Sequence, residues 1–266
     1  FQPMSAWLLA MSAFINISTL ENRVKVLSGV AAKAQVIEQE MELARTVQKA
    51  FLDLPKLPQD VNVVCHHEAM LYVSGDTYFV DWNQDHRKLT FLINDVTGHG
   101  VQAALKASGV SVIANTIWRV QLDNAWKSKQ ITHYSQMVQD FYERMDGKTD
   151  VVAMGGGEFD LATGRVSLYR QNFPFPILVS PKATDTQNKE SRRTDNWVVR
   201  MLTIPHACEV DLQLAPGSFI VFTSDGFLDN SRRAHAFVRY LRKHIGRETE
   251  NLNAETISSL LLDCKA

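Results

Sequence analysis

The stretch Leu92-Ile93-Asn94-Asp95-Val96-Thr97-Gly98-His99-Gly100 does most to decide the fold of this chain. Its apolar run ends at Asp95, which places a carboxylate at the edge of a predicted β-sheet. Two glycines, Gly98 and Gly100, then let the backbone turn sharply and approach a ligand closely. A helical pattern follows at once, so its free N–H groups face the same place. The stretch predicts a strand, a turn and a helix around a functional carboxylate. Taken alone, it fits equally well an aspartate that only caps the helix.

Two other segments have the same construction. Val73-Ser74-Gly75-Asp76 and Thr223-Ser224-Asp225-Gly226 each follow an apolar run and place an aspartate beside a glycine. Oxygen ligands of this kind suit Mg²⁺ or Mn²⁺ and not Zn²⁺. Two such cations, held ~3.5–4 Å apart, need several carboxylates plus waters. Together the three aspartates indicate metal-assisted hydrolysis of a phosphate ester. A fourth segment, Asp160 to Gly164, is typical of a hairpin turn.

The remaining pattern alternates blocks of strands with blocks of helices. Strands are predicted at Val61–Val64, Ala69–Val73, Tyr78–Trp82, Leu89–Ile93, Val151–Phe159, Arg165–Tyr169, Phe175–Val179, Trp197–Leu202, Glu209–Leu214 and Phe219–Thr223. Helices are predicted after Gly98 as far as Trp118, and at His133–Met145, Ala234–Ile245 and Ala254–Cys264. The polar stretch 182–196 is predicted to be a flexible loop. Strands with helices grouped in the middle and at the end predict an α+β layered fold.

A helical segment precedes this domain. Between Leu27 and Phe51, apolar or small residues recur at alternating steps of three and four, with the polar Gln48 in the same register. This heptad seam predicts a dimerising helix. An amphipathic helix packed on its own domain explains so short a seam equally well. We divide the chain into an N-terminal helical linker or dimerisation segment, 1–55, and a catalytic domain, 56–266.

Composition excludes some classes of partner. The 266 residues carry a formal net charge of -1, so nothing indicates a nucleic-acid or anionic-membrane partner. The first twenty residues are uncharged but are interrupted by polar ones, which predicts a buried or partner-packed helix. A membrane span, which needs ~20 predominantly apolar residues, is the less favoured alternative. The start lacks a basic region typical of a signal peptide. We therefore expect a cytoplasmic protein, or the cytoplasmic part of a membrane-anchored sensor.

Taken in order, these motifs resemble those of a known family, the bacterial PPM-type (2C-like) serine/threonine phosphatases of the SpoIIE and RsbU group. The resemblance begins near Glu38, where Met41 to Leu52 is similar to the family's helix-to-domain junction. Ser74-Gly75-Asp76 matches the family's Ser-Gly-Asp motif, and Asp95 to Gly100 matches Asp-Val-Ser-Gly-His-Gly with Thr97 in place of serine. Asp225-Gly226 matches the family's late Asp-Gly. The four together are specific, whereas any one of them alone is weak.

The resemblance implies an αββα sandwich with a centre of two Mn²⁺ or Mg²⁺ ions. Asp76, Asp95, the carbonyl of Val96 and Asp225 would be the metal ligands, and Asp76 and Asp95 would carry the catalysis. The implied activity is hydrolysis of phosphoserine or phosphothreonine by metal-activated water. The implied substrate is a phosphorylated STAS-domain regulator of the anti-anti-sigma type, within a partner-switching pathway. A homodimer formed through the N-terminal helices, controlled by an upstream sensor, is also implied.

Two departures from the family pattern leave an alternative open. Where the family has an Asn-Ala-Gly-His-Pro-like segment, this chain has Arg170 to Pro176. The family also ends on a strand with an Asp-Asp-x-Thr motif, which supplies another metal ligand, whereas this sequence ends after a predicted helix. We expect either that this strand follows residue 266 or that metal binding is impaired. The alternative is a non-catalytic pseudophosphatase that binds a regulatory partner.

Overall fold

The computed structural model describes residues 3–69, 72–119, 130–146, 152–181, 197–225, 231–248 and 252–265. By spatial proximity the chain divides into two compact units, Phe1–Val47 and Gln48–Ala266. The division falls inside the long helix α1 (Pro3–Ala50), so the last turn of that helix belongs to the second unit. The division into a linker or dimerisation segment, 1–55, and a domain, 56–266, stays a prediction. The expected loop at 182–196 and the glycine of Asp225-Gly226 lie outside the described residues.

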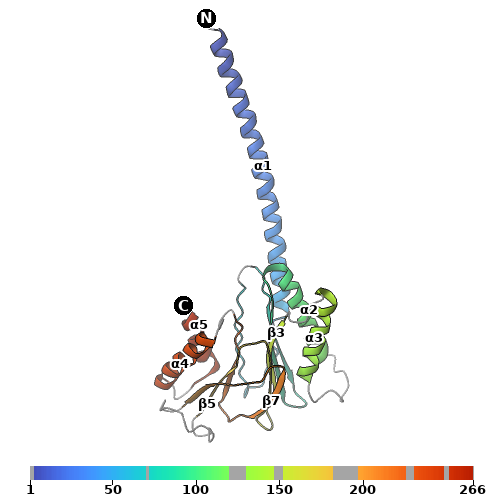
Figure 1. Cartoon of the computed structure of the whole chain (residues 1–266), viewed down its shortest axis with the longest axis vertical. Helices are drawn as coiled ribbons and strands as arrows, with labels where there is room; N and C mark the ends of the chain where they lie inside the picture. The colour runs from blue at the N-terminus through green and yellow to red at the C-terminus, as the bar shows by residue number, and fades with distance from the viewer. Residues whose placement is uncertain are drawn as a thin grey trace. The chain divides into compact units, whose positions relative to one another are not determined.

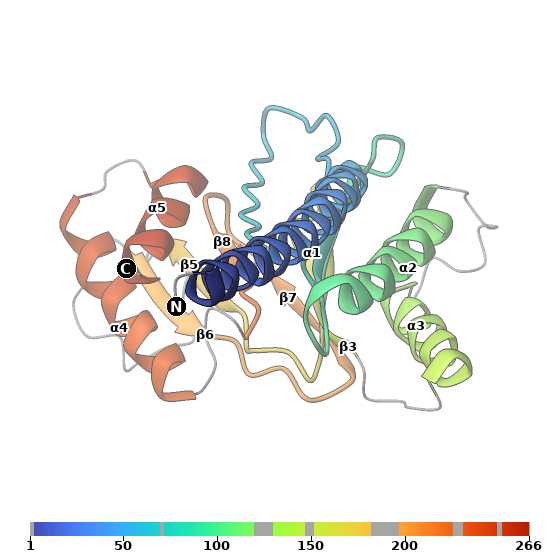
Figure 2. The same ribbon diagram turned by 90° about the horizontal axis from the view of Figure 1, so that it is seen from above.

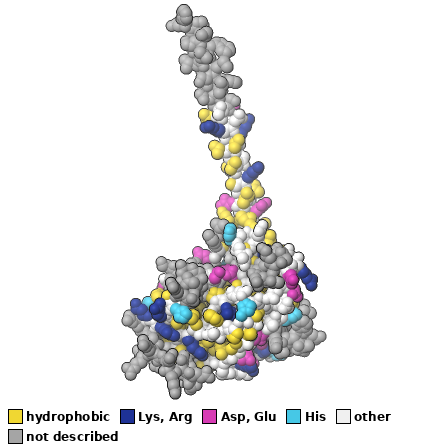
Figure 3. Space-filling model, viewed as in Figure 1, with side chains coloured by type: hydrophobic (Ala, Val, Ile, Leu, Met, Phe, Trp, Pro, Cys, Tyr) yellow, Lys and Arg dark blue, Asp and Glu magenta, His cyan; other side chains and the backbone are white. Residues whose placement is uncertain are grey.

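The first unit is helical throughout its described residues. The predicted helix from Leu27 onward is confirmed, and it is continuous with the helix of the preceding residues. All side chains from Thr19 to Glu40 are exposed, including those of Val30 and Ile37 on the heptad seam. Figure 3 shows hydrophobic side chains at the surface of the described part of this helix. Among the described helices, none is both long and apolar enough to cross a bilayer.

The second unit contains two antiparallel sheets. Its strands are β1 (Asp76–Asn83), β2 (Lys88–Val96), β3 (Val152–Asp160), β4 (Arg165–Gln171), β5 (Ile177–Pro181), β6 (Trp197–Met201), β7 (Cys208–Gln213) and β8 (Phe219–Val221). The five-stranded sheet has the order β1-β2-β3-β4-β7, and the three-stranded sheet has the order β6-β5-β8. The helices are α2 (Gly100–Arg119), α3 (Gln130–Asp146), α4 (Ser231–Glu248) and α5 (Ala254–Lys265). The predicted α+β class is confirmed.

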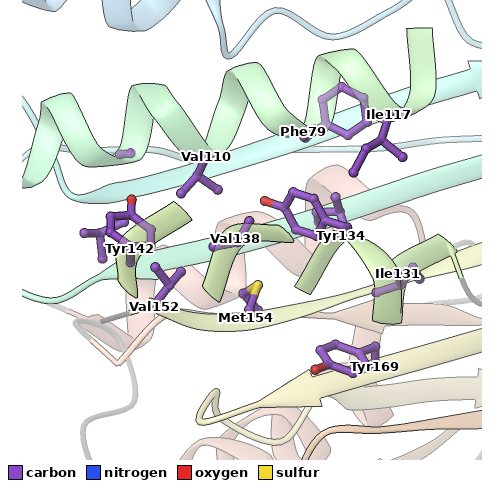
Figure 4. Packing of buried hydrophobic residues seen from close by; sticks show 14 residues of the cluster. Phe79, Val110, Ile117, Ile131, Tyr134, Val138, Tyr142, Val152, Met154 and Tyr169 are labelled. Carbon is purple, nitrogen blue, oxygen red and sulfur yellow. The ribbon is translucent and has the colours of Figure 1, made fainter. Parts of the chain in front are cut away.

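Three hydrophobic clusters hold four layers together. In the first, α2 and α3 pack on the outer face of the five-stranded sheet, where Val110 and Val138 meet Met154 (Figure 4). In the second, α4 and α5 pack on the three-stranded sheet. The third cluster, which includes Leu168 and Leu178, lies between the two sheets. Figures 1 and 2 both show one helix pair on each side of the strands, as an αββα sandwich requires.

Two predicted strands are wrong. Residues 61–64 belong to neither sheet, and neither do the described residues of Ala69–Val73, of which 70 and 71 lie outside the described part. The period of two is nevertheless present, because side chains 61–69 alternate between half-buried and exposed. In place of a ladder, side chains anchor this stretch: Asn62 donates to the Glu255 carboxylate of α5 at 3.1 Å. Alternating burial of side chains shows that the chain is extended and has one covered face. A β-strand must in addition pair with a neighbouring strand, which the described residues of this stretch do not do.

A glycine tract on β3 allows close packing where side chains would have no room. Gly155, Gly156 and Gly157 lie on β3 between β2 and β4. A Cβ atom at Gly155 would lie 2.6 Å from the Phe173 ring. A Cβ atom at Gly156 would lie 2.4 Å from the carbonyl oxygen of Phe91. Because backbone atoms of a paired strand cannot move aside, Gly156 has no room for a side chain.

We therefore expect Gly156→Ala to lower the free energy of unfolding by about 1–3 kcal/mol, the usual cost of overpacking. Urea denaturation followed by tryptophan fluorescence measures this change. Gly29→Ala in α1 is the matched control, since no atom lies within 4 Å of the added Cβ. Its effect should be neutral or stabilising, because alanine is a better helix former. Equal midpoints for Gly156→Ala and the parent chain would contradict the steric argument.

Candidate metal centre

Two of the predicted metal ligands face each other across a strand pair. Asp76 is the first residue of β1 and is paired directly with Asp95 near the end of β2. Side chains directly opposite in an antiparallel pair have Cβ atoms about 4.5–5.5 Å apart, and like charges at such positions are destabilising. Both side chains are half-buried. The pairing therefore concentrates negative charge at one end of the five-stranded sheet.

The third predicted aspartate joins the same cluster from the other sheet. Asp225 follows β8 and is exposed, and its neighbour Ser224 is hydrogen-bonded to Asp76, which brings the segment after β8 to the same edge. Burial, followed by the charges of Asp76 and Asp225, raises the pKa of Asp95 to about 8. Asp95 is thus the shared member of the three. The structure brings together all three aspartates named from the sequence.

The Asp76 carboxylate is oriented by a serine that the sequence did not single out. Ser224 Oγ donates to Asp76 Oδ2 at 3.0 Å, although the two residues are 148 positions apart. The backbone N–H of Asp76 donates to Ser74 Oγ at 3.0 Å, and His67 Nε2 lies 3.2 Å from the Asp76 carbonyl oxygen. The one available signal for Ser224 was its place beside Asp225.

The fourth predicted ligand, the Val96 carbonyl, lies against a glycine. A Cβ atom at Gly75 would lie 2.7 Å from the Val96 oxygen and 3.2 Å from Ala103 Cβ, in the first turn of α2. The Val96 N–H donates to the Gly75 carbonyl at 3.3 Å. Because Gly75 has no side chain, the start of β1, the end of β2 and the start of α2 can lie in contact.

The predicted turn after Asp95 is confirmed. Gly98 has φ 111° and Gly100 has φ 74°, which is the left-handed region that glycine adopts without strain. Helix α2 then begins at Gly100. The residues 97–99 between Val96 and the helix are exposed, so the end of β2 opens to solvent.

The carboxylate and carbonyl oxygens of this site are of the kind that binds hard cations, but they are not arranged around a common position. Among the described residues, no group of three or more His, Cys, Asp or Glu side chains is arranged to hold a metal ion. Burial and the nearby charges of Asp76 and Asp225 instead favour the protonated form of Asp95. Carboxylate and carbonyl oxygens are the ligands that Mg²⁺ and Mn²⁺ prefer. The chemistry of the site therefore matches such a cation, provided that Asp95 loses its proton.

The comparison with protein families decides the class of this chain. The model of stage II sporulation protein E (SpoIIE) matches residues 85–265, which is more than half of the chain. The chain belongs to the SpoIIE family. A search of curated proteins found no match to this chain.

Solved structures support the same fold for this SpoIIE-family chain. The SiaA PP2C domain of Pseudomonas aeruginosa is 17% identical, with a TM-score of 0.58 and coverage of 88% of this chain and 91% of that one. The RsbU and RsbW domains of a Mycobacterium tuberculosis protein are 18% identical, with a TM-score of 0.53 and coverage of 72% and 49%. The PP2C phosphatase domain and regulatory fragment of Bacillus subtilis SpoIIE are 16% identical, with a TM-score of 0.51 and coverage of 73% and 52%. The chain thus spans about half the length of the last two structures.

The segment that departs from the family pattern, Arg170 to Pro176, is built as a rigid turn. The Arg170 guanidinium donates to the carbonyls of Ile204 and Phe173 and lies 4.3 Å from the centre of the Phe175 ring. Asn172 adopts φ 50° and its side chain bonds to His206. This turn follows β4 at the end of the sheet where β2 delivers Asp95, since β3 pairs with both strands. The segment that departs from the family pattern therefore lies at the same end of the sheet as Asp95.

The raised pKa of Asp95 predicts a pH dependence of the metal-free protein. Because the folded-state pKa (about 8) exceeds the unfolded value (about 3.9), this group stabilises the fold fully below pH ~4. That contribution is lost as the pH rises through about 8. In EDTA, the melting temperature of the parent chain should therefore fall relative to that of Asp95→Asn between pH 5 and 9.

Asp85→Asn, which changes an exposed aspartate in the β1–β2 turn, is the control and should follow the parent chain. Parallel curves for the parent chain and Asp95→Asn would show that Asp95 titrates as an ordinary carboxyl.

Proposed function

We propose that this chain is a metal-dependent protein phosphatase that hydrolyses phosphoserine or phosphothreonine. The observation that carries the proposal is the position of Asp95 directly opposite Asp76, with the segment of Ser224 and Asp225 bonded to Asp76, in a SpoIIE-family chain. The fold shared with PP2C domains supports it. Three carboxyls gathered at one edge have no evident structural use, because they repel one another when ionised.

Asp76, Asp95, the Val96 carbonyl and Asp225 would hold two Mn²⁺ or Mg²⁺ ions. When bound, such ions supply a water-derived nucleophile and stabilise negative charge on the phosphoryl oxygens. Asp95 lies directly opposite Asp76 and close enough to Asp225 to feel its charge, so its carboxylate would be the central ligand of such a site. Its proton must leave first, so cation binding is coupled to proton release.

The neighbouring groups orient the ligands. The Ser224 hydroxyl fixes one oxygen of Asp76, which gives this carboxylate a defined orientation. Gly75 keeps the Val96 carbonyl close to the start of β1. The N-terminus of α2 at Gly100 adds free N–H groups that favour an anion nearby. These groups would favour a phosphate ester beside the carboxylates.

The substrate we propose is a phosphorylated STAS-domain regulator in a partner-switching pathway. The site lies at an exposed edge, where Asp225 and residues 97–99 face solvent, so a phosphorylated side chain on another folded protein can reach it. One of the similar structures contains RsbU and RsbW domains together, which supports a regulatory protein as partner.

The test is phosphate release from a phosphoserine STAS-domain protein, measured with and without Mn²⁺. We expect Mn²⁺-dependent release by the parent chain. Asp95→Asn should reduce it about 100-fold or more, a barrier increase of about 2.7 kcal/mol. Asp85→Asn makes the same chemical change on an exposed turn and should retain activity.

Absence of release from the parent chain would favour the alternative, a non-catalytic module that binds the regulator. Binding of the phosphorylated regulator without turnover, measured by calorimetry, would then identify that module. Release that is unchanged in Asp95→Asn would contradict the proposed centre.

We further propose that the chain dimerises through the heptad seam of α1. Val30 and Ile37 lie on this seam and are 60% and 57% exposed. Exposed apolar side chains repeated at heptad spacing are stabilised when a second helix covers them.

Light scattering after size exclusion measures the mass in solution. The parent chain should have a mass of twice 30.0 kDa, the mass of one chain. Ile37→Asp should have a mass of 30.0 kDa, because a charge buried between the two helices disfavours their association. Val36→Asp, beside the seam and also exposed, should remain dimeric. A parent chain of 30.0 kDa would contradict dimerisation.

A further inference from the structure

The last turn of α1 contains a buried polar side chain. Gln48 is 7% exposed, and its amide bonds to Ser74 in both directions. Gln48 Nε2 donates to the Ser74 carbonyl at 2.7 Å, and the Ser74 N–H donates to Gln48 Oε1 at 3.0 Å. The side chain thus pairs with the backbone as a neighbouring strand would. Gln48 is also the polar residue that interrupts the heptad seam.

Glutamine at position 48 is not the obvious residue for a buried site, because burying an amide is costly unless both its C=O and its NH₂ group are hydrogen-bonded. An apolar side chain would extend the seam at no such cost. A glutamate would have the same shape, but its ionised carboxylate could not donate to the Ser74 carbonyl. The geometry therefore requires a side chain of this length that both donates and accepts.

The segment held by Gln48 leads directly to Asp76. Ser74 Oγ accepts the N–H of Asp76, and between them Gly75 is enclosed by the Val96 carbonyl and Ala103. Two residues after Asp76, Tyr78 Oη donates to the Leu52 carbonyl at 2.6 Å. The end of α1 and the residues after it are thus attached to both sides of Asp76.

We infer that Gln48 is a positioning residue, which sets the place of the Asp76 carboxylate for a divalent cation by fixing the Ser74 backbone. This inference rests on the proposed function, since it concerns the same cation site. Both polar atoms of the Gln48 amide are bonded to Ser74, so Gln48 is not assigned as a ligand. It acts by fixing the peptide two residues before Asp76, while Ser224 fixes the carboxylate oxygen.

The experiment is a titration of the full chain with Mn²⁺ alone, followed by calorimetry, with the melting temperature measured in EDTA alongside. We expect Gln48→Glu and Gln48→Ala to weaken Mn²⁺ binding by about 10–100-fold, as groups that orient metal ligands do. Gln39→Glu, at an exposed position of the same helix, is the control for the change of charge and should bind as the parent chain does.

A purely structural role would lower the melting temperature and leave the Mn²⁺ affinity of the folded protein unchanged. That result would overturn the inference and leave the proposed function intact. Failure of both variants to fold would also overturn it, because Gln48 would then serve stability. A parent chain that binds no Mn²⁺ would overturn the proposed function and this inference together.

Discussion

The placement of Asp76 directly opposite Asp95 is the constraint on which the rest of the structure depends. Antiparallel pairing fixes the two carboxyls side by side, and Asp225 adds a third from the other sheet. Burial and mutual repulsion make the ionised state of Asp95 unfavourable, so the fold must hold these groups by other means. Ser224 bonds to one oxygen of Asp76, and Gly75 lets three backbone segments meet. A fold that tolerates such an arrangement at one edge has its stability elsewhere, in the clusters on and between the sheets.

The four-layer architecture explains how this edge is formed. Helices α2 and α3 cover one sheet, α4 and α5 cover the other, and the inner faces of both sheets pack together. Gly155 on β3 allows that contact at the centre, because the rings of Phe173 and Phe222 occupy the space of a side chain there. The apolar layers therefore fix the distance between the sheets. That distance in turn decides whether Ser224 and Asp225, after β8, can reach Asp76 and Asp95, on β1 and β2.

Much of this could be predicted from the sequence, because the deciding signals are local. The apolar run before Asp95 and the glycines after it specify a strand, a turn and a helix, and Asp225 likewise follows a strand. Asp76 can also be recognised beside a glycine, although it begins β1 and does not end a strand. The strand predicted at 61–64 failed because alternating burial shows one covered face and not the presence of a partner strand. Ser224 and Gln48 were missed as site residues because their partners lie 148 and 26 positions away. No local pattern records such a contact, and a serine or glutamine in isolation is unremarkable.

The separation of Ser224 and Asp76 along the chain has a consequence for the order of folding. Closing a long loop costs entropy before the contact contributes any free energy, so contacts between distant segments form late. The β1–β2 hairpin, with a short turn at residues 84–87, can pair early and bring Asp76 beside Asp95. The link to the segment after β8 must wait until both sheets exist and have docked. The complete set of carboxyls is therefore assembled only in the final stage of folding, and partly folded chains do not carry it.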